Sequence, residues 1–231
     1  VFKYLFSKRG LLAFPAANIG AFYRTEGDAR PSIQIHFTPG AGGMDDKGNM
    51  VPSPKPGVNS TTCVLRPEAR GYVHIRSNDP KAPPKILYNY LTSEEDCRRT
   101  VEGVKKQRAI YASKPFQEIA GEELTPGAHV QTDEQILEYC RKEGGSVYHP
   151  VGTCKMGSAD DVNAVVDNNL RVHGLHALRV VDASIFPNII SGNTHAPTVA
   201  VAERAADLIL ADREKNRADA FAGLPPKGID S

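Results

Sequence analysis

Alternating apolar and polar positions in the first third of the chain predict short β-strands. Within residues 32–38, three apolar side chains alternate with Gln34 and His36. This period of two is typical of a strand that belongs to a sheet with one covered face. Turn residues separate further stretches of similar character, at 19–25, 61–66, 72–76 and 86–90. We therefore expect an antiparallel sheet.

The segment Pro39–Asn59 interrupts this pattern. It is rich in glycine and proline. Long stretches without regular structure are usually functional or disordered. The segment is read either as a mobile surface loop or as a flap over a substrate entrance.

Helical spacing takes over after the predicted strands. Residues 93–112 have apolar positions at helical intervals, and Thr92 with Glu95 has the spacing of a capping box. A second helix is predicted at 133–142, with Thr132 and Gln135 at its start and glycines at its end. We expect these two helices to back the sheet.

The last third has a different character. Residues 178–181 read as a short strand. Residues 198–212 read as an amphipathic helix, with one face made of Val199, Ala202, Ala206 and Ile209. The fold class is α+β, divided into a domain at 1–145, a segment at 146–212 that carries the chemistry, and a peripheral polar tail at 213–231.

Composition excludes several classes of function. The 231 residues carry a net charge of +1, which gives no electrostatic basis for binding nucleic acid. No apolar run approaches the ~20 residues of a transmembrane helix, so membrane association is not indicated. Four cysteines lack the spacing of a zinc site, and no metal is expected. Reduced thiols favour a cytoplasmic location, which a targeting signal outside this chain would change.

Two histidines on predicted loops are the candidates for chemistry. His149 lies in Ser146–Gly157, which reads SVYHPVGTCKMG, and His195 lies in Ser191–Thr198, which reads SGNTHAPT. Imidazole titrates near neutral pH, so it suits general acid–base catalysis. Cys154 lies five positions after His149, and a Cys/His nucleophile is the weaker alternative.

These two segments, with Leu178–Pro187 between them, resemble the C-terminal signature of the glucose–methanol–choline (GMC) flavin oxidoreductases. The segments Gly10–Pro15, Asp79–Pro84 and Asn89–Leu91 are similar to landmarks of that family's substrate domain, and the resemblance covers residues 1–212. It implies FAD as cofactor and an alcohol as small-molecule substrate. A base would take the hydroxyl proton while the carbon gives a hydride to flavin N5.

The chain lacks the family's dinucleotide-binding turn. That turn needs Gly-x-Gly-x-x-Gly between a strand and a helix. The dense cluster Gly40–Gly43 has neither the third glycine nor a following helix, and the chain opens at Val1. We therefore expect a C-terminal portion of a longer flavoenzyme, whose N-terminal FAD-binding part is its partner.

The resemblance assigns His149 and His195 as the catalytic pair. Which of them is the base stays open, and a pair can share a proton. The family has His or Asn at the position of His195, and dehydrogenase-type members more often have Asn, so the choline-type subclass stays open. Asn193 and Tyr148 are the candidates for orienting substrate.

Five residues are candidates for contact with FAD. Asp182 and Ala183 resemble the family's turn near the ribityl chain and pyrophosphate. Pro197 suits a first helical position, and Ala196 has no side-chain acceptor for a cap. The amides near Thr198 would then be free to donate to the flavin C2 carbonyl, where the helix dipole stabilises negative charge.

Two alternatives remain beside alcohol oxidation. The family includes hydroxynitrile lyases that bind FAD without redox chemistry and also use a histidine pair. The isolated chain could also be an inactive structural fragment.

Overall fold

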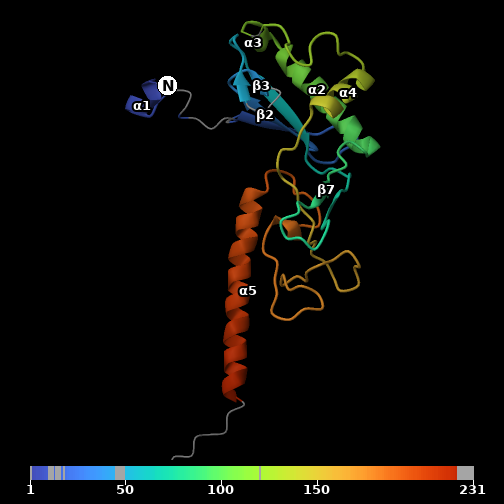
Figure 1. Ribbon diagram of the computed structural model, residues 1–231. Coiled ribbons are helices and arrows are strands. Elements are labelled where there is room, and N and C mark those ends of the chain that lie inside the picture. The colour runs from blue at the N-terminus through green and yellow to red at the C-terminus, as the bar shows by residue number, and fades with distance from the viewer. Residues whose placement is uncertain are drawn as a thin grey trace, which may run out of the picture. The chain divides into compact units, whose positions relative to one another are not determined.

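The computed structural model describes residues 2–9, 13, 17, 19–44, 50–119 and 121–222, and it divides the chain into two compact units (Figure 1). Unit 1 is Val1–Val147 and unit 2 is Tyr148–Ser231. The division falls two residues after the predicted end of the first domain. The predicted landmark Gly10–Pro15 lies outside the described residues except for position 13.

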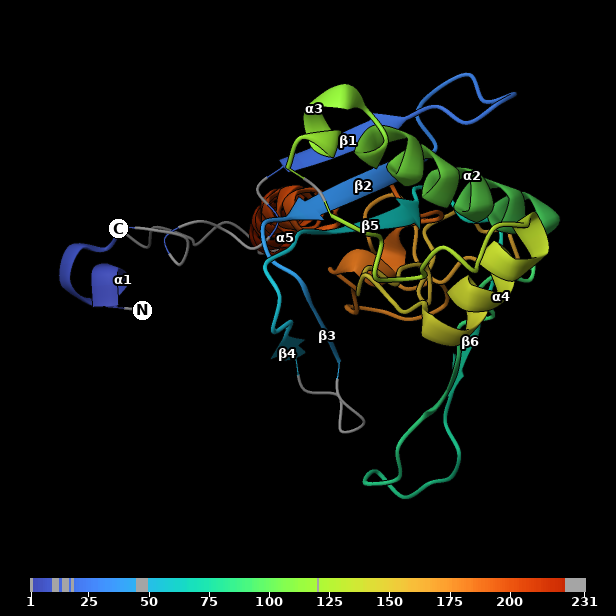
Figure 2. The same ribbon diagram turned by 90° about the horizontal axis from the view of Figure 1, so that it is seen from above.

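Unit 1 begins with a short helix, α1 (Phe2–Ser7), and contains a three-stranded antiparallel sheet. The strands β1 (Ile19–Tyr23), β2 (Ile33–Thr38) and β5 (Asn59–Val64) lie in the order β1-β2-β5 (Figure 2). Ile33 and Ile35 are buried. The antiparallel sheet and the α+β class predicted from the alternation are confirmed.

The described part of the segment 39–59, predicted as a mobile surface loop or a flap, contains regular structure. It contains β3 (Gly42–Met44) and β4 (Met50–Pro52), which pair antiparallel. The Ser53 amide donates to the Ala41 carbonyl at 2.8 Å beside this pair. Glycine and proline have low strand propensity, so backbone hydrogen bonds account for the pairing of β3 with β4.

The next two strands form a hairpin of their own. These strands, β6 (Tyr72–His74) and β7 (Lys85–Leu87), pair antiparallel and are shorter than the predicted stretches. Adjacent prolines at 83 and 84 precede β7, and proline lacks the amide that continues a ladder.

The long helix α2 (Glu94–Tyr111) covers one face of the main sheet (Figure 2). Val101 and Val104 are buried on another side of α2, in a core cluster with Val130 and Ile136. Gly103 allows the close approach, because a Cβ at that position would lie 2.6 Å from Thr62 Oγ1. The N-cap is Ser93, whose hydroxyl accepts from the Asp96 amide at 3.5 Å, so the predicted Thr92 cap is wrong.

The Thr92 hydroxyl instead donates to the Asn89 carbonyl at 2.9 Å. A short helix, α3 (Lys114–Gln117), follows α2. The helix α4 (Asp133–Glu143) packs against α2 through buried Ile136. Its predicted capping box between Thr132 and Gln135 is confirmed, as is its end at Gly144.

Unit 2 has little regular structure apart from the 3-10 helix η2 (Ala183–Ile185) and the long helix α5 (His195–Ala222). Its core consists of Val166, Leu170, Ile185, Phe186 and Ala205. The predicted strand at 178–181 does not form. The segment makes only an isolated bridge between Arg171 and Arg179.

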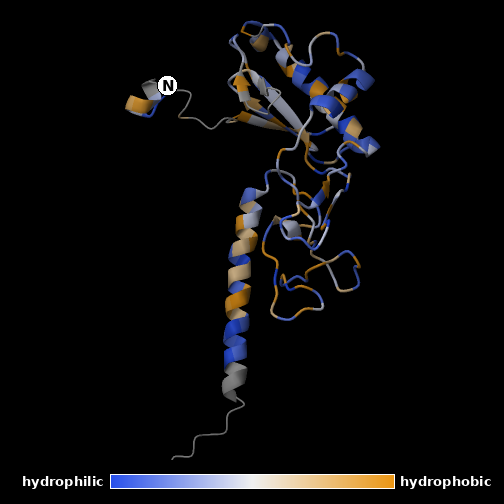
Figure 3. Cartoon of the chain, in the orientation of Figure 1, coloured by the Kyte–Doolittle hydropathy of each residue, from blue (hydrophilic) through white to orange (hydrophobic). Residues whose placement is uncertain are grey.

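The helix α5 begins before the predicted residue 198 and runs into the predicted tail. Its predicted apolar face is not the buried one, since Val199 and Ile209 are 46% and 44% exposed. Val201 and Ala205 face the core instead. Figure 3 shows apolar residues along much of α5, which explains why the spacing alone selected the wrong stripe. No helix within the described ranges is long and apolar enough to cross a membrane.

Candidate active site

The structure brings His149 together with two residues that precede α5. Asn193 Nδ2 lies 2.9 Å from His149 Nε2. Thr194 Oγ1 lies 3.0 Å from His149 Nδ1. Both nitrogens of the imidazole are therefore held by residues more than forty positions away in the sequence. The ring has one defined orientation within unit 2.

Backbone hydrogen bonds to η2 fix the segment that follows His149. The Cys154 amide donates to the Ser184 carbonyl at 3.0 Å, and the Met156 amide donates to the Ile185 carbonyl at 2.8 Å. Ile185 is fully buried. The histidine segment is thus anchored on the core of unit 2.

The residue before the histidine has an unusual backbone. Tyr148 has φ of 60°, in the left-handed region, and its side chain is 83% exposed. A bulky residue rarely adopts this conformation, and such strain is concentrated at functional sites. Pro150 restricts His149 to extended angles from the other side.

The start of α5 differs from the prediction. The Thr198 amide donates to the Thr194 carbonyl at 3.1 Å, so the helix begins at His195 and Pro197 is its third residue. The predicted free amide at Thr198 is therefore wrong. The amides that precede the helical ladder are those of His195 and Ala196, since Pro197 has none.

The predicted histidine pair is not a hydrogen-bonded pair. Within the part of the chain that the structure describes, no hydrogen bond joins His195 to His149. His195 is exposed at the first position of α5. Thr194 holds His149 instead, and sequence reasoning missed it. A threonine before a helix reads as an ordinary N-cap, and nothing local points to a partner 45 residues away.

Asp182 makes the turn that its position predicts. Its side chain accepts a hydrogen bond from the Ser184 amide at 2.8 Å and caps η2, whose Ala183 is partly buried against the core of unit 2. The contact of these two residues with FAD stays a prediction.

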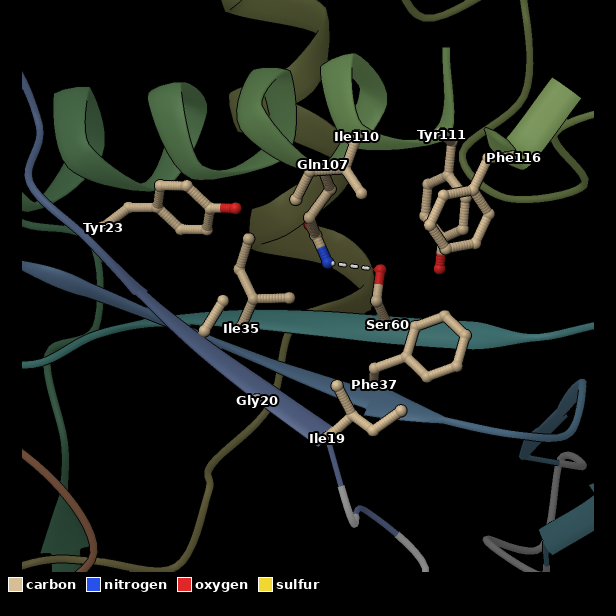
Figure 4. Close-up of a pocket in the computed structure, with 11 residues that line it drawn as sticks. Ile19, Gly20, Tyr23, Ile35, Phe37, Ser60, Gln107, Ile110, Tyr111 and Phe116 are labelled. Carbon is tan, nitrogen blue, oxygen red and sulfur yellow. Dashed lines mark hydrogen bonds between the residues drawn. The ribbon is translucent and has the colours of Figure 1, made fainter. Parts of the chain in front are cut away.

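Unit 1 holds a separate apolar cavity of about 350 Å³ between α2, α3 and the sheet (Figure 4). Gln107 donates to Ser60 across it at 2.8 Å, and the Tyr111 hydroxyl is buried without a partner. No carboxylate, histidine or cysteine lines this cavity. It therefore lacks a group for proton transfer near neutral pH.

Two of the cysteines and the acidic residues offer no competing centre, and the Cys154 alternative stays a prediction. Burial raises the pKa of the Cys63 and Cys140 thiols, which keeps them protonated and unreactive. Among the residues that the structure describes, no group of three or more His, Cys, Asp or Glu side chains could hold a metal ion. The site around His149 is the candidate with acid–base chemistry.

Comparison with known proteins decides the family. The family model for GMC oxidoreductase matches residues 67–202, which is more than half of the chain. The chain belongs to the GMC oxidoreductase family. The match includes η2, the His149 segment and the start of α5.

Curated relatives agree with this membership. The chain is 38% identical over 208 residues to oxygen-dependent choline dehydrogenase 1 of Chromohalobacter salexigens, covering 90% of the chain and 37% of that protein. It is 36% identical over 231 residues to alcohol dehydrogenase [acceptor] of Pseudomonas putida, covering 100% of the chain and 41% of that protein. The chain thus spans about two fifths of the length of these relatives.

Solved structures share the fold. Pyridoxine 4-oxidase from Mesorbium loti matches with a TM-score of 0.73 and 28% identity, over 83% of this chain and 37% of that one. Formate oxidase from Aspergillus oryzae matches with a TM-score of 0.77 over 93% of this chain and 41% of that one, and at 24% identity it supports the fold alone.

FAD is the cofactor of the GMC oxidoreductase family to which the chain belongs. The described residues fit part of such a cofactor. The His195 and Ala196 amides, which precede the helical ladder at the positive end of α5, suit a carbonyl or an anionic group, and η2 lies on the same core.

Proposed function

We propose that this chain is the C-terminal part of an FAD-dependent enzyme that oxidises a primary alcohol to an aldehyde. Family membership and the names of the choline and alcohol dehydrogenase relatives support the reaction class. The arrangement of His149 carries the proposal. Thr194 holds Nδ1, and Nε2 lies at hydrogen-bond distance from the Asn193 side-chain amide.

His149 is the base in this proposal. Its Nε2 takes the proton of the substrate hydroxyl, which lets the oxygen electrons form the carbonyl as the hydride leaves the carbon. FAD, when bound, supplies the acceptor for that hydride. The position of the Asn193 amide, 2.9 Å from Nε2, marks where the substrate oxygen would lie.

The remaining site residues bind and orient. Asn193 turns its amide from Nε2 to the substrate oxygen, and exposed His195 donates to the same oxygen from the start of α5. Tyr148 flanks the entrance to His149. Two histidines and an amide around one oxygen would stabilise the charge that develops on it.

The cofactor contacts follow from the two local structures. Asp182 and Ala183 would hold the ribityl and phosphate end. The His195 and Ala196 amides, at the positive end of α5, would donate to the flavin C2 carbonyl. Pro197 restricts the backbone of the first turn of α5, and the Thr198 amide closes that turn by donating to the Thr194 carbonyl. A longer polypeptide would supply the glycine-rich phosphate-binding turn.

A substrate panel tests the reaction class. The full-length polypeptide is mixed without oxygen with primary alcohols of increasing size, and the flavin absorbance is followed. Bleaching with formation of the aldehyde supports oxidation. Release of cyanide from a hydroxynitrile without bleaching would replace the proposal by the lyase alternative. A folded polypeptide that binds no FAD would leave only the alternative of an inactive structural fragment.

A further inference from the structure

We propose that Thr194 is a positioning residue for His149: its hydroxyl accepts from the ring Nδ1–H and, together with the Asn193 amide that donates to Nε2, keeps Nε2 as the lone-pair nitrogen. Its catalytic consequence rests on the proposed function, because it matters for the rate only if His149 is the base. The tautomer itself does not depend on that function. The central observation is the 3.0 Å contact between Thr194 Oγ1 and His149 Nδ1.

The two contacts of the ring have different chemistry. The Asn193 amide nitrogen can only donate, so His149 Nε2, at 2.9 Å, must accept. A neutral imidazole with an accepting Nε2 carries its proton on Nδ1. Thr194 Oγ1 then accepts that proton's hydrogen bond, which a hydroxyl can do and a methyl group cannot.

The position of Thr194 explains why its hydroxyl is available. Thr194 is the residue before α5, where a threonine side chain usually accepts from an amide of the first turn. Here the third helical residue is Pro197, which has no amide to donate, and the Thr194 carbonyl makes the ordinary first helical bonds, accepting from the Thr198 amide at 3.1 Å and from the Thr198 hydroxyl at 2.7 Å. The Thr194 side chain points at His149 instead.

Burial makes the contact specific. Thr194 is only 8% exposed, whereas Asn193 beside it is exposed. Water competes poorly for a buried hydroxyl, so Thr194 holds one side of the ring permanently. Asn193 lies at the open side, from which substrate would approach. The ring is therefore fixed at Nδ1 and free to exchange partners at Nε2.

The same contact acts in the proton step. When Nε2 takes a proton, the ring becomes cationic and its Nδ1–H bond to Thr194 becomes charge-assisted. A charge-assisted hydrogen bond is about twice as strong as one between neutral groups. Removing the hydroxyl should slow the proton step roughly 10- to 100-fold, which corresponds to about 1.4–2.8 kcal/mol.

Nitrogen NMR of the ring tests the tautomer directly. The full-length polypeptide is labelled with ring-¹⁵N histidine, and the His149 signals are assigned by their loss in His149→Gln. We expect the Nδ1–H tautomer in wild type and in Thr194→Ser. In Thr194→Val, which keeps the size and removes the hydroxyl, Nδ1–H loses its acceptor while the exposed Asn193 amide can turn to water, so the Nε2–H form should appear. An Nε2–H ring in wild type, or an unchanged ring in Thr194→Val, would overturn the proposal.

Kinetics tests the consequence. Thr194→Val should lower the rate of flavin reduction 10- to 100-fold without changing KM or the bound FAD, and Thr194→Ser should restore the rate. Thr100→Val is the matched control, because it removes a hydroxyl that bonds the Asp96 carbonyl at 2.7 Å in α2 of unit 1. If Thr194→Val does not fold, Thr194→Ser against Thr194→Ala gives the same comparison. Equal rates in either pair would contradict the proposal.

Failure of the proposed function can be distinguished from failure of the role proposed for Thr194. A wild-type polypeptide that no alcohol reduces, yet with His149 in the Nδ1–H form, would refute the proposed function and leave the role of Thr194 standing.

Discussion

Asp28→Asn should loosen the contact between the sheet and α2 in unit 1. Asp28 lies in the turn between β1 and β2, and Arg99 lies on α2. The guanidinium is bidentate, with Nη2 2.7 Å from Oδ1 and Nε 3.1 Å from Oδ2. The two side chains are only 14% and 13% exposed. An asparagine would present an amide to Arg99 and lose the charge.

The structure sets the size of the effect. Each charge-assisted bond contributes about 1.5–3 kcal/mol, and partial desolvation of both groups offsets part of that sum. Arg99 keeps a second partner, Glu95 Oε1 at 3.0 Å. We therefore expect a loss of about 2–3 kcal/mol in the local opening free energy. This corresponds to roughly 30- to 150-fold faster hydrogen exchange in α2 and the β1–β2 turn.

The effect should depend on pH with a defined sign. Hydrogen bonding from Arg99, aided by the Thr25 and Ser32 hydroxyls, holds the pKa of the Asp28 carboxyl well below its usual range. A lowered pKa contributes stability above the unfolded pKa of about 3.9. The difference between wild type and Asp28→Asn should therefore be full near neutral pH and shrink as the pH falls below about 4.

Hydrogen exchange with peptide resolution on the full-length polypeptide measures this. Glu122→Gln is the control, because its ion pair with Lys55 is 75% and 71% exposed and should contribute little. Exchange in α2 that is as slow in Asp28→Asn as in wild type at neutral pH would refute the reasoning. So would an equal acceleration in Glu122→Gln.

Three further predictions concern single positions. Gly103→Ala should lower the free energy of unfolding by about 1–2 kcal/mol in urea, because its Cβ would meet Thr62 Oγ1 at 2.6 Å, while Gly145→Ala, with nothing within 4 Å, should change it little. Thr132→Ala should cost about 1 kcal/mol in the same measurement by removing the capping box, and an unchanged midpoint would contradict this. Cys154→Ser should leave flavin reduction by alcohol at the wild-type rate, and abolished reduction would restore the Cys/His nucleophile as an alternative.

Local signals predicted the parts of the fold that local interactions determine. The helix α4 is confirmed at both ends because Thr132, Gln135 and Gly144 make its caps within a few residues. The alternation around Ile35 also placed β2, although the strand pairs with distant residues and Gln34 is buried like its apolar neighbours. The cap of α2 was misassigned by one residue, since Thr92 and Ser93 both offer a hydroxyl and only the structure shows which accepts.

Long-range contacts account for the errors at the candidate site. Proline favours a first helical position, which predicted a helix from Pro197. The helix begins two residues earlier because the Thr194 carbonyl accepts the first helical bond. The hydroxyl of Thr194 is directed to His149, 45 residues earlier in the sequence. No spacing rule contains that contact.

The face of α5 shows a different limit. Its residues carry an apolar stripe through Val199 and Ile209 and another through Val201 and Ala205, and the core of unit 2 covers only the second. Periodicity identifies stripes and cannot tell which partner each one meets. His149 and His195 were selected by a family resemblance, and family membership is now established. Their roles stay predictions.

The central claim is that His149 is the base in flavin-linked alcohol oxidation, and single-turnover flavin reduction tests it most directly. Wild type, His149→Gln and the exposed control His176→Gln, each with full FAD content, are mixed with alcohol in the absence of oxygen. We predict that His149→Gln reduces its flavin at least about 100-fold more slowly than wild type and that His176→Gln does not differ from wild type. Reduction of the His149→Gln flavin at the wild-type rate would contradict the account.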